Sequence, residues 1–263
     1  MSFDRAILGR TGIEVCRLGL AASYGAPASA VEQAFDSGVN YFYWGSFRRD
    51  AFGDGLRTLS TKRDRFLLVT QSYSRMASLI APSLERALRA LRFDYSDVLL
   101  LGLWNGAPPR RILDACRKLR ERGLVRHLAV STHNRPLIPG LAADPRFDIF
   151  HVRYNAVHRG AEREVFPQML AHDRPGLVSF TATSWRQLLG HKRIPPGEKI
   201  PSAADCYRFV LTQPAVNVCM TGPADAAQFG HAVEALHRGP MCEEELAWMR
   251  RVGDAIYGKA RKE

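Results

Sequence analysis

The sequence has no apolar stretch long enough to cross a membrane. A membrane-spanning helix needs roughly 18–20 consecutive apolar residues, and the hydrophobic runs of this chain are shorter. The first residues, MSFDRAILGRTG, have neither the apolar centre nor the small-residue cleavage site of a secretory signal. We therefore expect a soluble, cytoplasmic protein that makes no use of a membrane.

Cysteine is scarce, and none of the five cysteines stands in a Cys-x-x-Cys pair. That spacing is typical of structural zinc sites and of redox-active thiols. Its absence predicts reduced thiols that are buried as small hydrophobic side chains. The five are Cys16, Cys116, Cys206, Cys219 and Cys242.

Acidic residues are outnumbered by basic ones, 26 to 37, which gives a formal net charge of +11. Such an excess can serve nucleic-acid binding, but here the basic residues are scattered. The densest run, residues 117–127, falls at an expected helix end, where cations complement the helix dipole. We therefore expect no nucleic-acid partner, and interpret the charge as a solvated surface or a pocket for anionic ligands.

The chain alternates short apolar runs with amphipathic segments. Strands are predicted at residues 17–21, 40–44, 66–71, 97–103, 125–131, 149–155, 176–183 and 215–222. Helices are predicted at residues 28–38, 79–92, 110–123, 204–212, 224–239 and 243–257. The strand runs are apolar on both faces, as in a parallel sheet that helices cover on the outside.

Eight strands, each followed by a helix or a helix-like connection, in roughly 250 residues predict an α/β fold of the (β/α)8, or TIM barrel, type. A doubly wound sheet is the alternative, but its Gly-x-Gly-x-x-Gly turn is missing after the first strand. No linker or low-complexity segment interrupts residues 1–263, so we expect a single domain. The proline-rich segment 191–203 is expected to be a loop over the mouth or the side of the barrel, and the last helix is additional to the eight units.

The chain resembles the aldo-keto reductases over nearly its whole length. Residues 8–21 (LGRTGIEVCRLGLA) are similar to that family's N-terminal β-hairpin and first strand, and residues 34–42 (AFDSGVNYF) to the junction before its catalytic aspartate. Residues 125–134, 147–155 and 218–229 resemble its fifth strand, its sixth strand, and its eighth strand with the phosphate loop. The resemblance implies an oxidoreductase that reduces carbonyls with NADPH or NADH.

The resemblance also shows that the family's four catalytic residues are replaced. In the family, a tyrosine protonates the carbonyl oxygen, a lysine paired with an aspartate lowers the pKa of that tyrosine, and a histidine orients the carbonyl. Here Tyr43 stands at the aspartate position, Arg48 at the tyrosine position, Gln71 at the lysine position and Gly102 at the histidine position. No tyrosine occurs between Gly45 and residue 68, so the missing phenol does not depend on the alignment.

The cofactor site implied by the resemblance is only partly retained. Residues at its positions that keep the family's type, or that can still contact a nicotinamide cofactor, are Ser131, His151, Thr181, Gly222, Pro223 and Gln228. Thr132, Ala224 and Ala232 replace side chains with which the family holds the carboxamide, the 2′-phosphate and the adenine. The resemblance therefore implies that NADPH or NADH binds weakly, mainly through backbone amides.

Tyr43 is the first candidate for a nonstandard proton donor. It alternates with Tyr41 along one strand, so its side chain is predicted to point into the barrel. Its hydroxyl can then enter the space left at Gly102, while Arg48 lowers its pKa or holds a ligand carboxylate. The alternative is that Tyr43 and Gln71 hydrogen-bond to each other and only fill the barrel.

Aromatic residues near the strand ends suggest a pocket for a flat ligand or, equally, loop packing. They are Trp44, Tyr73 and Trp104, with Asn105 beside the last. Arg153, two positions after His151, can bind an anion or pair with Glu162 or Glu164.

No metal site and no hydrolase motif is expected. A zinc site needs three or four ligands in tight geometry. His133 and His151 are only two, and no His-x-His pair opens the first strand. The chain also has no Gly-x-Ser-x-Gly motif, which argues against an α/β-hydrolase.

Two functions from different classes remain open. The first is an oxidoreductase with a nicotinamide cofactor and an unusual catalytic set of Tyr43, Arg48 and Gln71. The second is a catalytically inactive barrel, a pseudoenzyme, that binds a small anionic or aromatic ligand or a protein partner. The sequence indicates no oligomeric state.

Overall fold

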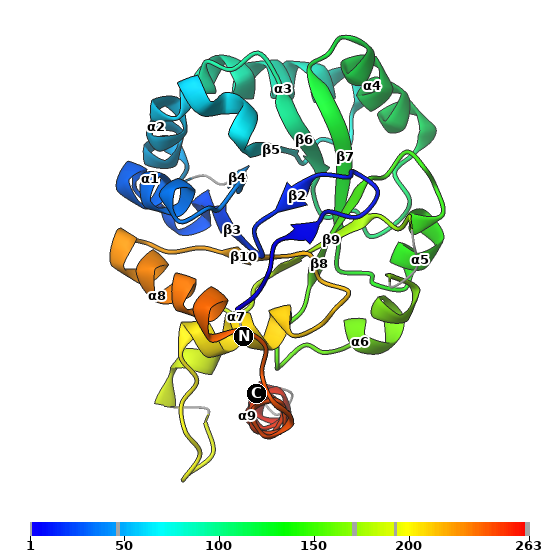
Figure 1. Cartoon of the computed structure of the whole chain (residues 1–263). Coiled ribbons are helices and arrows are strands. Elements are labelled where there is room, and N and C mark those ends of the chain that lie inside the picture. The colour runs from blue at the N-terminus through cyan, green and yellow to red at the C-terminus, as the bar shows by residue number, and fades with distance from the viewer. Residues whose placement is uncertain (1, 46–47, 170–172, 192–193, 261–263) are drawn as a thin grey trace.

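Eight parallel strands close into a barrel in the order β10-β3-β4-β5-β6-β7-β8-β9, and helices surround it (Figure 1). The computed structural model describes residues 2–45, 48–169, 173–191 and 194–260. The barrel strands are β3 (Leu18–Ala21), β4 (Tyr41–Trp44), β5 (Leu67–Ser72), β6 (Ser96–Leu101), β7 (Val125–Thr132), β8 (Ile149–Arg153), β9 (Gly176–Phe180) and β10 (Val218–Thr221). The predicted (β/α)8 barrel and all of its predicted strands are confirmed, with small differences at the strand ends.

The six predicted helices are also present. They are α1 (Ala28–Asp36), α3 (Ala77–Leu91), α4 (Arg110–Glu121), α7 (Ala203–Leu211), α8 (Ala226–Arg238) and α9 (Glu243–Ala260). Within the described residues, three more helices occur that the sequence did not indicate: α2 (Asp50–Thr58), α5 (Leu137–Ala142) and α6 (Ala161–Glu164). Short single turns precede or follow several of them. Together these helices complete the connections between the strands.

Helix α2 escaped prediction because it contains Gly53 and Gly55, which disfavour a helix in isolation. Both glycines are buried against neighbouring elements. A Cβ atom at Gly55 would lie 2.8 Å from the Val31 side chain and 2.9 Å from the Ala28 backbone of α1. Glycine is therefore needed here so that α1 and α2 can pack closely, and this contact offsets the poor helix propensity.

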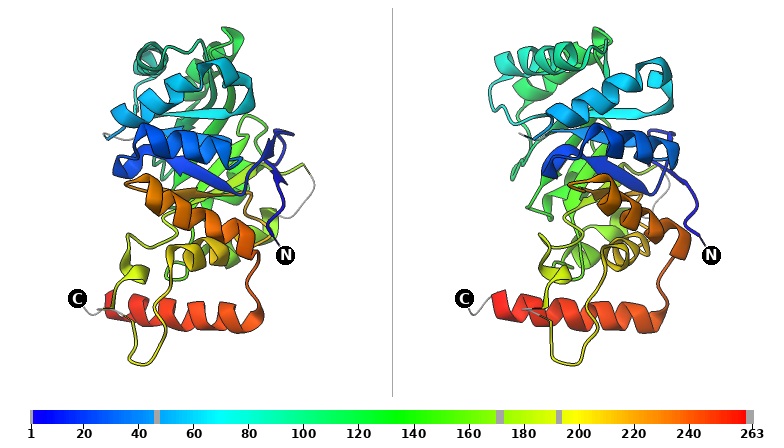
Figure 2. Two further views of the ribbon diagram at one scale, coloured as in Figure 1. Left: turned by 60° about the vertical axis from the view of Figure 1, so that its left-hand side comes forward. Right: turned by 90° about the vertical axis from the view of Figure 1, so that its left-hand side faces the viewer.

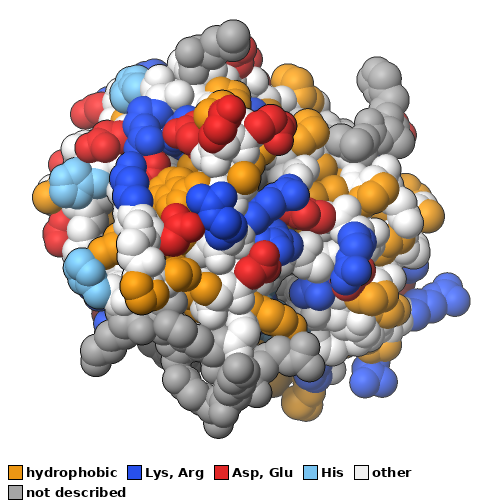
Figure 3. Space-filling view, turned by 90° about the horizontal axis from the view of Figure 1, so that it is seen from below, with side chains coloured by type: hydrophobic (Ala, Val, Ile, Leu, Met, Phe, Trp, Pro, Cys, Tyr) orange, Lys and Arg blue, Asp and Glu red, His pale blue; other side chains and the backbone are white. Residues whose placement is uncertain are grey.

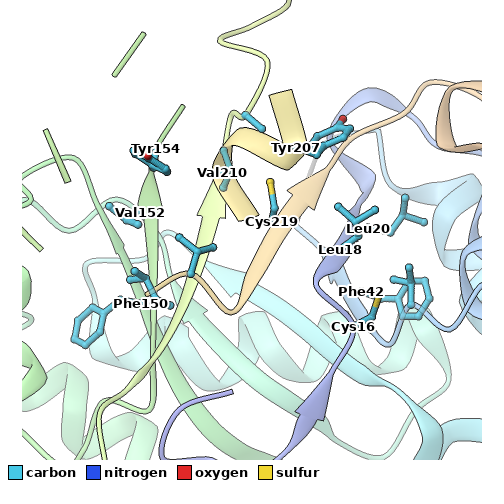
Figure 4. Packing of buried hydrophobic residues seen from close by; sticks show 14 of the residues in the cluster. Cys16, Leu18, Leu20, Phe42, Phe150, Val152, Tyr154, Tyr207, Val210 and Cys219 are labelled. Atoms are coloured by element: carbon cyan, nitrogen blue, oxygen red, sulfur yellow. The ribbon is translucent and has the colours of Figure 1, made fainter. Parts of the chain in front are cut away.

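The barrel has two apolar layers because successive strand residues point to opposite sides. One layer fills the interior and includes Tyr41, Val69, Val98, Ile149 and Val178. The other lies between strands and helices, where Phe42 packs edge-on against Phe52 and Phe66. Figure 4 shows part of this outer layer, with Leu18, Leu20, Val152 and Cys219 among its members.

The cysteines largely follow expectation. All five are free, and Cys16, Cys116, Cys206 and Cys219 are buried. Cys242 is exposed, just before α9, which corrects the expectation that all five are packed inside. Burial raises the pKa of the Cys116 thiol to about 12, so this thiol stays protonated and acts as a small hydrophobic group.

The predicted N-terminal hairpin is present as β1 (Ala6–Ile7) and β2 (Glu14–Val15), and it closes the end of the barrel at which the strands begin. Leu8 and Val15 belong to the interior apolar layer. Gly9, with φ of +50°, pairs with Pro175, and a Cβ atom there would lie 2.2 Å from a backbone nitrogen. Only glycine fits this approach, so the hairpin is locked against the barrel.

Helix α9 lies outside the barrel. The described part of the proline-rich segment 191–203 lies beside this helix (Figure 2). In that segment, the backbone carbonyl of Lys199 accepts a hydrogen bond from the indole N–H of Trp248, and Glu198 forms an ion pair with Arg251. The loop of residues 191–203 thus packs at the side of the molecule, and residues 192–193 lie outside the described part. The face seen from below carries basic and acidic side chains interspersed (Figure 3). None of the described helices combines the length and apolar composition that a bilayer crossing requires.

One contact that anchors α9 is made by Arg208, a buried arginine on α7. Arg208 donates to both carboxylate oxygens of Glu245, at 2.7 Å for the longer of the two, and also to the carbonyls of Gly239 and Pro240. The Arg208 hydrogen bonds hold the pKa of Glu245 at about 2. A half-buried carboxylate in this setting stabilises the fold as an anion.

We expect Glu245→Gln to lower the free energy of unfolding by about 2 kcal/mol, because Arg208 then keeps a buried charge without its bidentate partner. The loss should be full at pH values above the ordinary glutamate pKa of 4.5 and should shrink as the pH falls towards 2, where Glu245 itself becomes protonated. Urea unfolding at several pH values measures this. Glu243→Gln, in the same exposed first turn of α9, is the matched control and should change little. Equal losses in both variants would contradict the assigned role of the Arg208 contact.

Candidate functional site

A cavity of about 320 Å³ opens at the carboxyl ends of the barrel strands. Every barrel strand contributes to its wall. The strand residues are Ala21, Tyr43, Gln71, Leu100, Ser131, His151, Phe180, Met220 and Thr221. Helix α7 adds Tyr207, and the connections after the strands add Ser23, Tyr24, Tyr73, Leu103, Thr181, Ala182, Thr183, Trp185 and Gly222. Within the described chain, no Asp, Glu, Lys or Arg lines this cavity, so its wall is aromatic and polar but carries no formal charge.

The predicted site residues divide into two groups. Six of them line the cavity together: Tyr43, Gln71, Ser131, His151, Thr181 and Gly222. Arg48, Pro223 and Gln228 do not line it. The cavity therefore joins the candidates that end strands, because parallel strands deliver their carboxyl ends to one rim.

Tyr43 points inward as predicted, but its hydroxyl turns back on its own chain. It donates a hydrogen bond of 2.8 Å to the carbonyl of Gly45. Burial is the main cause that raises the pKa of Tyr43 well above its ordinary value, and the neighbouring Tyr73 raises it further. The charge of Arg49 lowers this pKa, but its effect is smaller. The interpretation that Tyr43 bonds to Gln71 is therefore wrong.

The space beside Gly102 is filled by other groups. A Cβ atom at Gly102 would lie 2.3 Å from the Gln71 amide nitrogen and 2.6 Å from the Tyr73 ring. The prediction that the Tyr43 hydroxyl enters this space is wrong for that reason. Gln71 also leaves its side-chain oxygen buried without a hydrogen-bond partner. An unpaired buried acceptor is costly, so this atom can receive a donor from a molecule in the cavity.

Arg48 does not line the cavity. Its side chain is exposed and lies near Gly25, and the charge that lowers the pKa of Tyr43 is that of Arg49. The next residue takes the inner position: the Arg49 guanidinium stacks 4.1 Å from the Trp44 ring centre and lines a second hollow that shares Tyr43, Gln71 and Tyr73 with the first. The sequence carries two adjacent arginines, and nothing in it distinguished them.

His151 is held by a neighbour inside the barrel. The Tyr41 hydroxyl lies 2.8 Å from His151 Nε2, and both residues are buried. Among the residues that the structure describes, Tyr41 has no other hydrogen-bond partner, so its proton must go to Nε2; in the reverse arrangement that proton would be buried without an acceptor. Nδ1 of His151 therefore carries the ring proton. Burial lowers the pKa of His151 to about 3, so the ring is neutral.

Ser131 retains a donor for a ligand. Its hydroxyl accepts from the Leu103 backbone N–H at 2.9 Å, which leaves its own proton available at the cavity wall. Leu103 has φ of +52°, and Thr181, Ser184, Trp185 and Arg186 also have positive φ. Strained backbone of this kind gathers at functional sites and needs surrounding structure to hold it.

The aromatic residues named from the sequence are mostly packing residues. Trp44 and Trp104 are buried, and Asn105 accepts from the His133 backbone; of the named set only Tyr73 reaches the cavity. The aromatic lining comes instead from Tyr24, Tyr43, Phe180, Trp185 and Tyr207. Trp185 follows β9 closely in the sequence, and this position was the available signal for it.

The phosphate-loop candidates hold one another. Gln228 accepts from the Ala224 backbone and donates to Asp225, whose other oxygen accepts from the Gln228 backbone and caps α8. The Tyr24 ring covers Gly222, where a Cβ atom would lie 2.8 Å from it. Gln228 is thus engaged within the loop, and the Asp225 carboxylate occupies the helix N-terminus that would otherwise attract a phosphate.

Arg153 ends β8 and is paired in the sheet with Phe180 of β9, which lines the cavity. It does not pair with the expected carboxylates, because Glu162 contacts Tyr154 and Arg250 while Glu164 binds Arg135 at 2.6 Å. Its guanidinium instead lies 5.6 Å from the Trp185 ring centre. Burial and the charge of Arg135 lower the pKa of Arg153. The prediction of a structural Arg153–Glu pair is therefore wrong.

His133 is exposed and contacts the Phe180 ring, whereas His151 is bound to Tyr41. In the described residues, no three His, Cys, Asp or Glu side chains gather where they could hold a metal ion.

A closed parallel barrel with a hairpin at one end and a lined cavity at the other defines a (β/α)8-barrel protein with its site at the strand carboxyl ends. A sequence model described as the Aldo/keto reductase family matches residues 23–184, so this chain belongs to the aldo/keto reductase family and is an oxidoreductase-like protein.

Two solved structures share the fold. The aldo-keto reductase AKR11C1 from Bacillus halodurans, in its holo form, has a TM-score of 0.79 at 19% identity, covering 95% of this chain and 96% of that one. Its apo form has a TM-score of 0.78 at 19% identity with the same coverage. At this identity the likeness is one of fold.

The hydrogen bond between Tyr41 and His151 predicts which nitrogen of the His151 ring carries the proton. We expect nitrogen NMR of the labelled protein to show His151 protonated at Nδ1 only and neutral down to about pH 4, since its pKa is about 3. His151→Gln identifies the resonance. Tyr41→Phe removes the donor to Nε2 and should abolish this single tautomer. A His151 that titrates near its ordinary value, or that is protonated at Nε2, would contradict the assignment.

Proposed function

We propose that this protein is an oxidoreductase-like barrel that binds a small ligand in its mouth cavity, binds a nicotinamide cofactor weakly, and does not carry out tyrosine-dependent carbonyl reduction. The observation that carries this proposal is the hydrogen bond from the Tyr43 hydroxyl to the Gly45 carbonyl. The hydroxyl of the first candidate donor is thereby directed at its own backbone.

The chemistry of carbonyl reduction requires a proton donor whose pKa has been lowered towards neutrality. Burial moves the pKa of Tyr43 in the opposite direction. The described cavity wall offers no lysine, aspartate or glutamate to reverse that shift, and Arg49, which lowers the pKa, has a smaller effect than the causes that raise it. Tyr43 is therefore a poor acid at this position.

His151 does not replace it. Its neutral ring offers an N–H at Nδ1, which can donate a hydrogen bond to a ligand oxygen but does not release a proton near neutral pH. Gln71 can accept from the same ligand, and Ser131 can donate to it. These three groups suit the recognition of a flat polar molecule between aromatic side chains.

The residues of this site fit the nicotinamide end of a cofactor better than its phosphate end. Ser131 would hold the carboxamide, and the Gly222–Pro223 turn would approach the phosphates; a reduced nicotinamide bound there supplies hydride. However, Asp225 places a carboxylate at the start of α8, and Gln228 accepts from the Ala224 backbone N–H in the same loop. Like-charge repulsion with the cofactor phosphates then weakens binding.

Calorimetric titration tests the cofactor part of the proposal. We expect NADPH and NADH to bind with Kd weaker than about 100 µM. Asp225→Ser keeps the helix cap but removes the charge, and should tighten NADPH binding by about threefold. Asp173→Ser, at an exposed residue outside the site, is the control. Low-micromolar binding that is indifferent to Asp225→Ser would overturn this part.

Turnover in the Tyr43→Phe variant tests the catalytic part. With NADPH and a panel of aldehydes, the reduction rate of the wild type should equal that of Tyr43→Phe, because the hydroxyl is engaged by Gly45. Tyr73→Phe, at an adjacent phenol of the cavity, is the matched comparison. A hundredfold loss of turnover that is confined to Tyr43→Phe, with the fold intact by circular dichroism, would show tyrosine-dependent reduction and would sink the proposal.

A further inference from the structure

We propose that Arg153 forms an anion subsite at the rim of the mouth cavity and that the ligand of this protein is a small aromatic molecule with a carboxylate. The inference rests on the ligand cavity of the proposed function and adds the chemical class of the ligand.

Arg153 is a cation without a carboxylate partner in the described chain. No Asp or Glu oxygen lies within 4.0 Å of it, and its Nε is buried without a hydrogen-bond acceptor. The two glutamates expected to pair with it are committed elsewhere: Glu162 to Tyr154 and Glu164 to Arg135. A guanidinium in this state has donors that a planar anion can satisfy in a bidentate manner.

The position of Arg153 directs it to the cavity. It follows His151 by two residues on β8, so the two side chains leave the same face of the strand about 6.6 Å apart along its length. In the sheet register, Arg153 lies opposite Phe180, and its guanidinium lies beside Trp185. Phe180 and Trp185 both line the cavity. The cation is thus at the rim, and the neutral His151 donor is deeper.

The surrounding charges favour a single negative charge. Arg135 is neutralised by Glu164. His133 and His158 flank Arg153, and their pKa values are lowered, first by burial and then by Arg153 and Arg135; for His158 the value is about 4. At neutral pH the group formed by Arg135, Glu164, Arg153 and the two histidines therefore carries one net positive charge. A carboxylate matches this charge, whereas a phosphate dianion exceeds it.

The spacing also defines the ligand's other end. An acceptor that receives the His151 Nδ1 proton must lie several ångströms from the anion, with an apolar body between them. An aromatic ring fits between Phe180 and Trp185, where edge and face contacts are favourable. An aryl carboxylate with a carbonyl or hydroxyl at the far side of the ring meets these requirements.

The probe for the test is 4-formylbenzoate, compared with its neutral methyl ester and with 4-formylphenyl phosphate. Tryptophan fluorescence and calorimetry report binding. We expect the wild type to bind the carboxylate about tenfold or more tightly than the ester, and more tightly than the phosphate. Arg153→Gln should remove this preference by weakening the acid alone, and Arg153→Lys should restore part of it because it keeps the charge.

Arg186→Gln is the matched control, since Arg186 is an exposed arginine next to Trp185 and should alter binding less than twofold. Equal affinity of wild type for acid and ester, an equal loss of both in Arg153→Gln, or no binding of the acid at 10 mM probe would overturn the subsite. A preference for the phosphate would overturn the carboxylate assignment. Tyr43-dependent reduction of the same aldehyde probe would instead overturn the proposed function, while charge-selective binding would still uphold the subsite.

Discussion

The hydrogen bond between Tyr41 and His151 determines which polar groups the barrel can present at its mouth. A barrel of eight strands is filled by its inward side chains, and those around this pair are almost all apolar. Two buried polar rings are tolerated there only because each satisfies the other. Since the Tyr41 hydroxyl donates to Nε2, the single ring proton of His151 lies on Nδ1 and the ring is neutral. The bottom of the cavity therefore carries an N–H donor but no charge.

The same requirement shapes the rest of the site. Replacing a lysine and its aspartate singly would leave a buried charge without a partner, which is strongly destabilising, whereas replacing both removes the cost. The resemblance predicts that Gln71 and Tyr43 are such a neutral set. These two side chains do not satisfy each other. The Tyr43 hydroxyl donates to the Gly45 carbonyl, and the Gln71 side-chain oxygen is left without a hydrogen-bond partner. Formal charge lies outside the cavity instead, on Arg49 in the neighbouring hollow and on Arg153 at the rim.

Much of the fold could be predicted because strand alternation and helix periodicity are local properties. Alternation from Tyr41 correctly placed Tyr43 inside the barrel. Helix α2 could not be predicted, because Gly53 and Gly55 argue against a helix until α1 is packed on them. Similarly, the resemblance located six of the residues that line the cavity but could not show that Gln228 is bound within its own loop or that Arg49, rather than Arg48, lines the neighbouring hollow.

The sequence by itself determined the eight strands and the set of strand ends that meet at the mouth, because these follow from residue type and from spacing along one chain. The tertiary structure alone decided the partners: Gly45 for Tyr43, Tyr41 for His151, and Glu164 for Arg135 rather than for Arg153. Hydrogen bonds and ion pairs depend on distances of a few tenths of an ångström between side chains from different elements, and such distances exist only once the barrel has closed.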